Sequence, residues 1–322
     1  MSKTKKWIFW IVMLIALVIY PRVFGIYYTN VFISVAIFAL FAVSYNLLLG
    51  YTGLLSFGHA MFFGVGAYGT ALALDHVEGM PLIVSVLLGA LAAIVLALIL
   101  CPIVVRVSGT AFAMLHLAFG QLMYVLALKL RGITGGEDGI GGFPIPELNI
   151  LGIVSIDMAD PTNFYYFAVT VLGLSVLFLW FFTKTPFGSI MTAIRDNDKR
   201  VDYLGFRVPQ SKAVIYTVSG CFAGVAGSIY ALFQNLISAD DGFHVMVSFA
   251  PIIMTMVGGI TSFIGPLMGA GIFGIIEELT SRYTERVELV MGLILILVIL
   301  FVPTGFMGFV NFVKQKFAKT AA

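Results

Sequence analysis

Residues 183–212 read TKTPFGSIMTAIRDNDKRVDYLGFRVPQSK, a charged segment that lies between two long apolar runs, 164–182 and 213–233. An excess of basic side chains places this segment on the cytoplasmic side of a membrane by the positive-inside rule. Its helix-forming interior and its mixed carboxylates predict a short helix that contacts a cytoplasmic protein. The alternative is an ordinary orienting loop, which needs the positive charge but neither of these two features. The charged residues are Lys184, Arg195, Lys199, Arg200, Arg207 and Lys212 against Asp196, Asp198 and Asp202.

The composition defines the class of the whole chain. Of its 322 residues, 60% are hydrophobic and 11% are charged, and the mean hydropathy is +1.05. Soluble domains have about 45–50% apolar and about 25% charged residues. The chain is therefore predicted to be a single polytopic, all-α membrane domain over residues 1–322. Its net charge of +2 gives no indication of a nucleic-acid partner.

Apolar runs of nearly spanning length follow one another along the chain. The first, 7–20, follows three lysines and has no small-residue cleavage site after it, so we expect a retained helix that starts in the cytoplasm. The pair 248–260 and 265–279 is short, so it forms either two tilted spans or a re-entrant hairpin. The other runs are 31–49, 54–74, 82–105, 110–128, 164–182, 213–233 and 287–302.

The distribution of basic residues orients these runs. With the N-terminus inside, loop 129–162 lies outside, segment 183–212 lies inside, and the tail with Lys314, Lys316 and Lys319 returns to the inside. An odd number of additional spans would leave the lysine tail outside. The sequence therefore predicts about ten transmembrane or re-entrant segments, with both termini in the cytoplasm.

Two glycine-containing breaks interrupt apolar runs, at 50–53 and at 258–266. Both share the local pattern Gly-x-x-Ser-Phe, at 53–57 and at 259–263. Irregular backbone at membrane depth is tolerated only when it is buried in protein or lines a wet cavity. Since an imidazole follows the first break, we predict a translocation pathway near these breaks, with the alternative that the same residues only pack helices. The predicted pathway residues are Asn46, Ser56, His59, Phe62 and Ser262.

Small residues at helical spacing predict close helix packing. One such face is Ser56, Ala60 and Gly64, and another is Gly220, Gly224 and Ser228. His116 is the second imidazole within an apolar run, after His59. Interhelical hydrogen bonding is the simplest interpretation of such residues.

Several kinds of chemistry lack their sequence signals. The chain has no Gly-x4-Gly-Lys-Ser/Thr phosphate loop, no catalytic triad pattern and no cluster of metal ligands. No acidic residue is securely placed in mid-membrane, where a proton- or sodium-driven transporter would need one. We therefore predict a protein that is not an enzyme, binds no metal or cofactor of its own, and relies on another protein for energy.

Three ordered stretches resemble the permease subunits of the branched-chain amino-acid ABC importers. The first is NLLLGYTGLLSFGHAMFFGVGAY at 46–68, and the second is the stretch 117–144, which ends in TGGEDGIGGFP. The third joins AIRDNDKRVDYLGF to GGITSFIGPLMGA. The resemblance extends over most of residues 31–310.

This resemblance implies an ABC importer permease fold in a bacterial cytoplasmic (inner) membrane. It implies four kinds of partner: a second homologous permease, two cytoplasmic ATPases that use ATP and magnesium, an extracytoplasmic binding protein and the lipid bilayer. Segment 183–212 would be the coupling loop, although of the usual Glu-Ala-Ala-x3-Gly pattern only Gly205 is present. The residues expected to contact the ATPase are Arg195, Asp196, Asn197, Asp198, Arg200 and Gly205. The expected extracytoplasmic loop residues are Thr134, Gly135, Gly136, Asp138 and Gly139.

The substrate class stays open within this resemblance, because related permeases carry urea, short amides and aromatic acids. A different class of function also stays open. A self-contained secondary transporter or small-solute channel would need no partner for segment 183–212.

Overall fold

The computed structural model describes residues 3–150, 154–284, 286–301 and 305–308. In chain order the helices are α1 (Lys3–Asn46), the π-helix η1 (Leu47–Tyr51), α2 (Ala60–His76), α3 (Leu82–Val104), α4 (Gly109–Lys129), α5 (Arg131–Thr134), α6 (Pro161–Lys184), α7 (Pro186–Tyr203), α8 (Val208–Gln234), α9 (Ala239–Phe243), α10 (Val245–Gly258), α11 (Gly265–Ser281) and α12 (Val287–Phe301). The strands are β1 (Ile140–Gly141), β2 (Leu148–Ile150), β3 (Val154–Ile156) and β4 (Leu236–Ile237).

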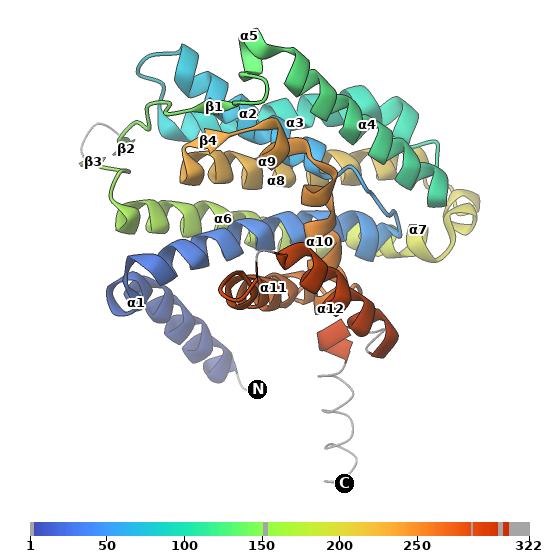
Figure 1. Cartoon of the computed structure of the whole chain (residues 1–322). Coiled ribbons are helices and arrows are strands. Elements are labelled where there is room, and N and C mark those ends of the chain that lie inside the picture. Colours follow the sequence, from blue (N-terminus) through green and yellow to red (C-terminus); the bar gives the residue numbers. More distant parts are fainter. Residues whose placement is uncertain (1–2, 151–153, 285, 302–304, 309–322) are drawn as a thin grey trace.

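Helix α1 contains two of the predicted segments, joined across a kink. Gly25 has φ 74° and ψ 174°, which is far from helical geometry and is accessible to glycine because it has no Cβ. Pro21, just before the kink, has no amide hydrogen to donate, which weakens the helix there. The two limbs lie at a clear angle to each other (Figure 1), so α1 reverses direction between 7–20 and 31–49.

Six helical stretches within the described residues are long and apolar enough to cross a membrane. This number is smaller than the predicted ten for two reasons. The kinked α1 counts once, as Ala16–Tyr51, and α2, α11 and α12 have only 17, 17 and 15 residues. The prediction of an all-α membrane protein is correct at the level of class.

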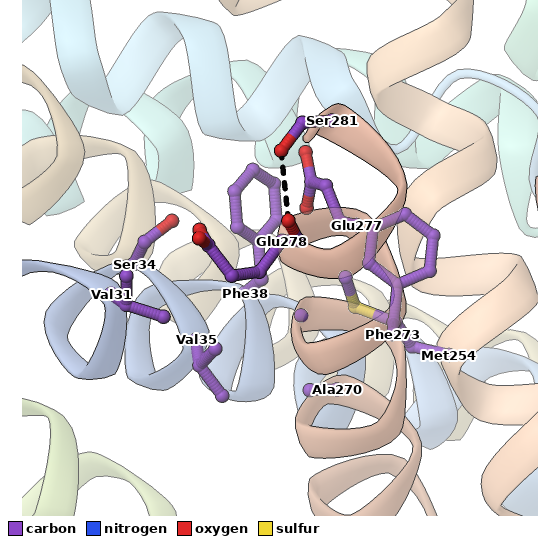
Figure 2. A pocket seen from close by; sticks show the side chains of 11 residues that line it. Val31, Ser34, Val35, Phe38, Met254, Ala270, Phe273, Glu277, Glu278 and Ser281 are labelled. Carbon is purple, nitrogen blue, oxygen red and sulfur yellow. Dashed lines mark hydrogen bonds between the residues drawn. The ribbon is translucent and has the colours of Figure 1, made fainter. Parts of the chain in front are cut away.

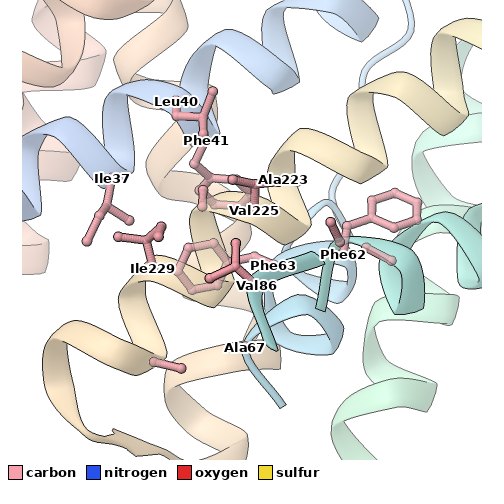
Figure 3. Close-up of a cluster of buried hydrophobic side chains, with 14 of the residues drawn as sticks. Ile37, Leu40, Phe41, Phe62, Phe63, Ala67, Val86, Ala223, Val225 and Ile229 are labelled. Atoms are coloured by element: carbon pink, nitrogen blue, oxygen red, sulfur yellow. The ribbon is translucent and has the colours of Figure 1, made fainter. Parts of the chain in front are cut away.

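The central packing unit consists of α2, α3 and α8, and small residues bring these helices together. A Cβ added to Gly66 would overlap the backbone of Gly224, and one added to Gly227 would overlap the carbonyl oxygen of Phe63. The predicted faces with Gly220, Gly224 and Ser228 therefore do pack helices. Large side chains from α1, α2 and α8, including Phe41, Phe63 and Ile229, fill the space beside them (Figure 3).

The segment 129–162 contains short strands that the prediction of an all-α fold missed. β1 pairs antiparallel with β4, with Ile140 opposite Ile237, and β2 pairs with β3, with Asn149 opposite Ser155. The first pairing connects the TGGEDG segment to the residues that follow α8. Strands of two or three residues are too short to show a sequence period, so only the tertiary contact defines them.

The two ends of the helical bundle carry different elements. Figure 1 shows the β2–β3 hairpin and the start of α6 at one end, and α7 at the opposite end. Asp160 begins α6 by accepting a hydrogen bond from the Thr162 amide at 2.9 Å, with Pro161 in the first turn. The loops 129–162 and 183–212 therefore lie at opposite ends of the bundle.

Candidate functional site

The first predicted break is longer than the four residues 50–53. After α1 the chain forms the π-helix η1, and residues 53–59 are non-helical up to the start of α2. Thr52 stabilises the end of η1, because its Oγ1 donates a hydrogen bond to the Leu48 carbonyl oxygen at 2.6 Å. Ser56 therefore lies outside any helix, and the predicted helical face of Ser56, Ala60 and Gly64 is wrong in its first member.

The second break meets the first. Residues 259–264 separate α10 from α11, as predicted, and the Asn46 amide Nδ2 donates a hydrogen bond to the Ser262 carbonyl oxygen at 3.2 Å. Gly50 lies against the carbonyl oxygen of Ile260, so a side chain at position 50 would not fit. The structure thus brings the predicted residues Asn46 and Ser262 together, through the backbone of Ser262.

His59 lies at the end of the first break, directly before α2, and is fully buried. Its Nε2 is 3.2 Å from the Ser44 hydroxyl oxygen. Its ring stacks on Phe41 and meets the rings of Tyr45 and Phe62 edge to face, at centroid distances of 5.3–5.6 Å. The predicted residues His59 and Phe62 are therefore in contact inside the bundle.

Ser56 belongs to the same region through Tyr45, whose hydroxyl oxygen accepts a hydrogen bond from the Ser56 amide at 3.4 Å. Three buried side-chain atoms near the first break have no hydrogen-bond partner within the described part of the chain: Asn46 Oδ1, Ser56 Oγ and His59 Nδ1. Buried polar atoms normally have a partner, which is often an ordered water. All three belong to residues predicted for the pathway, so the break is a polar region within an apolar bundle.

The sequence analysis missed several members of this polar region. Ser44 and Tyr45 precede Asn46 directly, and Ser219 of α8 donates a hydrogen bond to the Ser44 carbonyl oxygen at 2.6 Å. His116 and Tyr216 form a separate pair, since His116 Nε2 lies 3.0 Å from the Tyr216 hydroxyl oxygen. The sequence does show that these residues are polar and lie inside apolar runs. Which of them form pairs depends on which helices are neighbours, and the sequence does not show that.

The predicted coupling residues lie on α7, which is divided at Asn197 (φ −166°, ψ 99°). Asn197 accepts a hydrogen bond from the Arg200 amide at 3.0 Å, so it caps the second part of the helix. Gly205, with φ +87°, directly follows the C-cap residue Leu204, and its amide donates to the Asp202 carbonyl oxygen at 2.9 Å, as is typical of a glycine that ends a helix. The prediction of a helical segment is confirmed, with a kink that the sequence did not indicate.

The charges of α7 point in different directions. Asp196 is 70% exposed, whereas Asp198 pairs at 3.4 Å with Lys212, whose side chain is buried. Arg195 turns toward the bundle, where its Nη1 donates to the Gly50 carbonyl oxygen at 2.8 Å. Arg200 and Asp202 are exposed and have no ion pair within the described residues, whereas Arg195, Asp196 and Asp198 take part in ion pairs within the chain.

The predicted extracytoplasmic residues form a compact turn. Thr134 ends α5, and its hydroxyl donates to the Leu130 carbonyl oxygen at 2.9 Å. Gly135 and Gly139 are so close that a Cβ on Gly135 would overlap the Gly139 carbonyl, and Gly139 in turn packs on the backbone of Ile237. The turn is therefore fixed against β4 at one end of the bundle.

A cavity of about 260 Å³ lies elsewhere, between α1, α10 and α11 (Figure 2). Its apolar wall includes Val35, Phe38 and Phe273, and Glu277 and Glu278 lie at its polar side. Glu278 pairs with Arg282 at 2.9 Å and accepts a hydrogen bond from Tyr27. None of the predicted pathway residues lines this cavity. Within the described ranges, no three His, Cys, Asp or Glu residues are grouped so that they would hold a metal ion.

These features define a polytopic helical membrane protein with two broken helices that meet in its interior and a charged helix at one end. The chain belongs to the family of branched-chain amino acid transport system permease components, whose model matches residues 27–302. No solved structure matches the chain.

Curated relatives agree with this family. The high-affinity branched-chain amino acid transport system permease protein LivM of Salmonella typhimurium is 26% identical over 94% of this chain and 75% of its own length. LivH of the same organism is also 26% identical, over 84% of this chain and 91% of its own length. A probable LivM of Methanocaldococcus jannaschii is 24% identical over 84% of this chain and 83% of its own.

Proposed function

We propose that this chain is the translocating subunit of an ATP-driven importer for branched-chain or related amino acids, and that it does not hydrolyse ATP itself. The observation that carries the proposal is the family match over residues 27–302, together with the names of the relatives. The paired breaks support it, because a solute path needs polar groups inside the apolar bundle.

The proposed pathway runs along the polar region at the two breaks. Asn46, Ser56 and His59 each carry an unpartnered polar atom within the described structure, and Phe62 and Ser262 lie beside them. Such groups are suited to exchanging hydrogen bonds with water or with the polar groups of a solute. The cavity at Glu277 does not belong to this proposal.

The proposed partners follow from the two kinds of relatives. LivM and LivH are both named as permease proteins of a high-affinity branched-chain amino acid system, which supports pairing with a second, homologous permease. The complex would contain two ATPases that use ATP and magnesium, one of which would bind at α7. A solute-binding protein would deliver substrate to the loop containing Gly136 and Asp138. The chain itself is proposed to hold no cofactor.

The proposed topology has ten membrane segments, which requires counting the two limbs of α1 separately and including α2, α11 and α12. It places α7 in the cytoplasm and loop 129–162 outside a bacterial inner membrane, with both termini inside. The opposite placement of these loops in the bundle supports this arrangement (Figure 1). The lysine tail lies outside the described residues.

The docking of an ATPase to α7 tests the proposal directly. Asp202→Lys reverses an exposed charge of α7 without touching the Asp198–Lys212 pair or the Asp196–Arg195 pair. We expect this variant to reach the membrane at parental levels but to co-purify with less of the ATPase subunits of its own transport system. The matched control is Glu78→Lys, the same charge change in the exposed turn between α2 and α3.

Unreduced ATPase binding by the α7 variant would remove the Asp202 carboxylate from the docking surface. Solute transport by the purified chain alone, without any ATPase, would instead support the secondary transporter or channel and overturn the proposed importer.

A further inference from the structure

Arg195 is the one predicted coupling residue whose side chain binds the first break, while the side chain itself stays 33% exposed. Its Nη1 donates to the Gly50 carbonyl oxygen at 2.8 Å, across 145 residues of sequence. The carboxylate of Asp196 accepts from the Arg195 Nε and Nη2 atoms at 3.3 and 3.2 Å. The guanidinium is thereby held in one orientation, with one edge on the carboxylate and the other on the break.

The Gly50 carbonyl is available because the helix ends there. The last carbonyls of a helix lack intrahelical donors, and basic side chains often bind them. The amides of Thr52 and Gly53 bond back to Leu48 and Leu49, which leaves Gly50 for Arg195. Gly53 also allows this approach, since a Cβ there would lie 3.0 Å from Arg195 Cγ.

The same point of the first break touches the second break. Gly50 packs against the carbonyl oxygen of Ile260, and Asn46 binds the Ser262 carbonyl oxygen at 3.2 Å. A shift of Gly50 must therefore displace residues 259–264 or break these contacts, because the space between them is already filled. Arg195 thus reaches the place where the two breaks are joined.

The position of Arg195 on α7 suits a transmitting role. The kink at Asn197 separates it from Arg200 and Asp202, which are exposed. Its own part of the helix is anchored by the buried side chains of Met191 and Ile194. The part of α7 that carries Arg195 is therefore packed into the protein, whereas the polar residues after the kink are exposed.

We infer that Arg195 is a positioning residue that transmits motion of α7 to both helix breaks, and that it is not itself a docking contact for the ATPase. This inference rests on the proposed function, and it assigns Arg195 a different role from the one that the sequence predicts. Arginine suits this role because one planar group binds the Asp196 carboxylate and the Gly50 carbonyl together.

The test measures motion of the break independently of the transported solute. A single cysteine replaces Phe57, which lies within residues 53–59 and is partly exposed, and Cys101 and Cys221 are changed to alanine. The complex with its ATPases is reconstituted in vesicles, and the labelling rate of the cysteine by a small thiosulfonate reagent is compared with and without trapped ATP and vanadate. We expect a nucleotide-dependent change of several-fold in the parent.

We expect Arg195→Gln to abolish this change while the ATPases still co-purify and hydrolyse ATP. Arg195→Lys restores one donor toward Gly50 and is expected to recover part of the change. Arg106→Gln, an equal loss of charge at an exposed turn after α3, is the matched control and should behave like the parent.

Three results would overturn the inference. The first is a nucleotide response in Arg195→Gln that equals that of the parent. The second is loss of ATPase binding in Arg195→Gln, which would make Arg195 a docking contact, and the third is a parent whose cysteine does not respond to nucleotide. Failure of the parent chain to bind any ATPase would be a different result, since it contradicts the proposed function itself.

Discussion

At the scale of single residues, the two imidazoles inside the bundle have different surroundings. Both ring nitrogens of His116 have partners, the Phe112 carbonyl oxygen at 2.9 Å and the Tyr216 hydroxyl at 3.0 Å. The ring nitrogens of His59 have one hydrogen-bond partner within the described residues, the Ser44 hydroxyl, and Nδ1 has none there. A fully bonded imidazole joins helices, whereas one with a free atom is suited to a water or solute. This contrast favours His59 over His116 as a pathway residue.

His59→Leu tests this assignment. Ser44 keeps a hydrogen bond to the Phe41 carbonyl oxygen at 2.7 Å, so the substitution leaves no new unpaired hydroxyl, and complex assembly should be retained. Uptake of radiolabelled leucine should fall by about 2- to 10-fold, which corresponds to the loss of one hydrogen bond worth about 0.5–1.5 kcal/mol. His76→Leu, at the exposed end of α2, is the control and should transport normally. Parental uptake by His59→Leu would leave only a packing role for this residue.

At the scale of elements, small residues decide how α2, α3 and α8 pack. There is no hydrophobic driving force between helices within lipid, so close backbone approach and van der Waals contact stabilise the bundle. Gly66, Gly89 and Gly227 each lie where an added Cβ would overlap backbone or side-chain atoms of another helix. Within the described residues, three of the five buried polar atoms without a partner lie near η1, on Asn46, Ser56 and His59.

Gly227→Ala should therefore separate α8 from α2 at Phe63. Overpacking of this kind costs about 1–3 kcal/mol, so we expect a lower thermal unfolding temperature in detergent and a lower yield of folded protein. Gly173→Ala in α6 is the matched control, because an added Cβ there meets no atom within 4 Å. Equal unfolding temperatures for the two variants would contradict the packing that we describe.

At the scale of the whole molecule, the bundle places opposite chemical surfaces at its two ends. Segment 183–212 is rich in basic residues and forms α7, while loop 129–162 contains the TGGEDG turn held by the β1–β4 pairing. Figure 1 shows α7 and the β2–β3 hairpin at opposite ends of the helices, which fits a chain that crosses a membrane between them. The basic end is expected to face the cytoplasm.

Cysteine labelling of intact cells measures this orientation. A cysteine at Glu137 should react with a membrane-impermeant maleimide added outside, whereas cysteines at Lys199 and Lys316 should react only after the cells are opened. The expectation for Lys316 depends on ten segments, because an odd number would place the tail outside. Labelling of position 316 in intact cells would show that the proposed count is wrong, and labelling of Lys199 would invert the whole orientation.

The sequence by itself determined the class of the protein, the positions of both breaks and the charged helix, because hydropathy, glycine and charge act locally along the chain. It also indicated His59 and Asn46, since polar residues are rare within apolar runs. Only the tertiary structure decided that Asn46 meets Ser262, that Ser44 binds both His59 and Ser219, and that Arg195 binds Gly50. These contacts join residues far apart in the chain, so they depend on which helices are neighbours, and no local pattern encodes that arrangement.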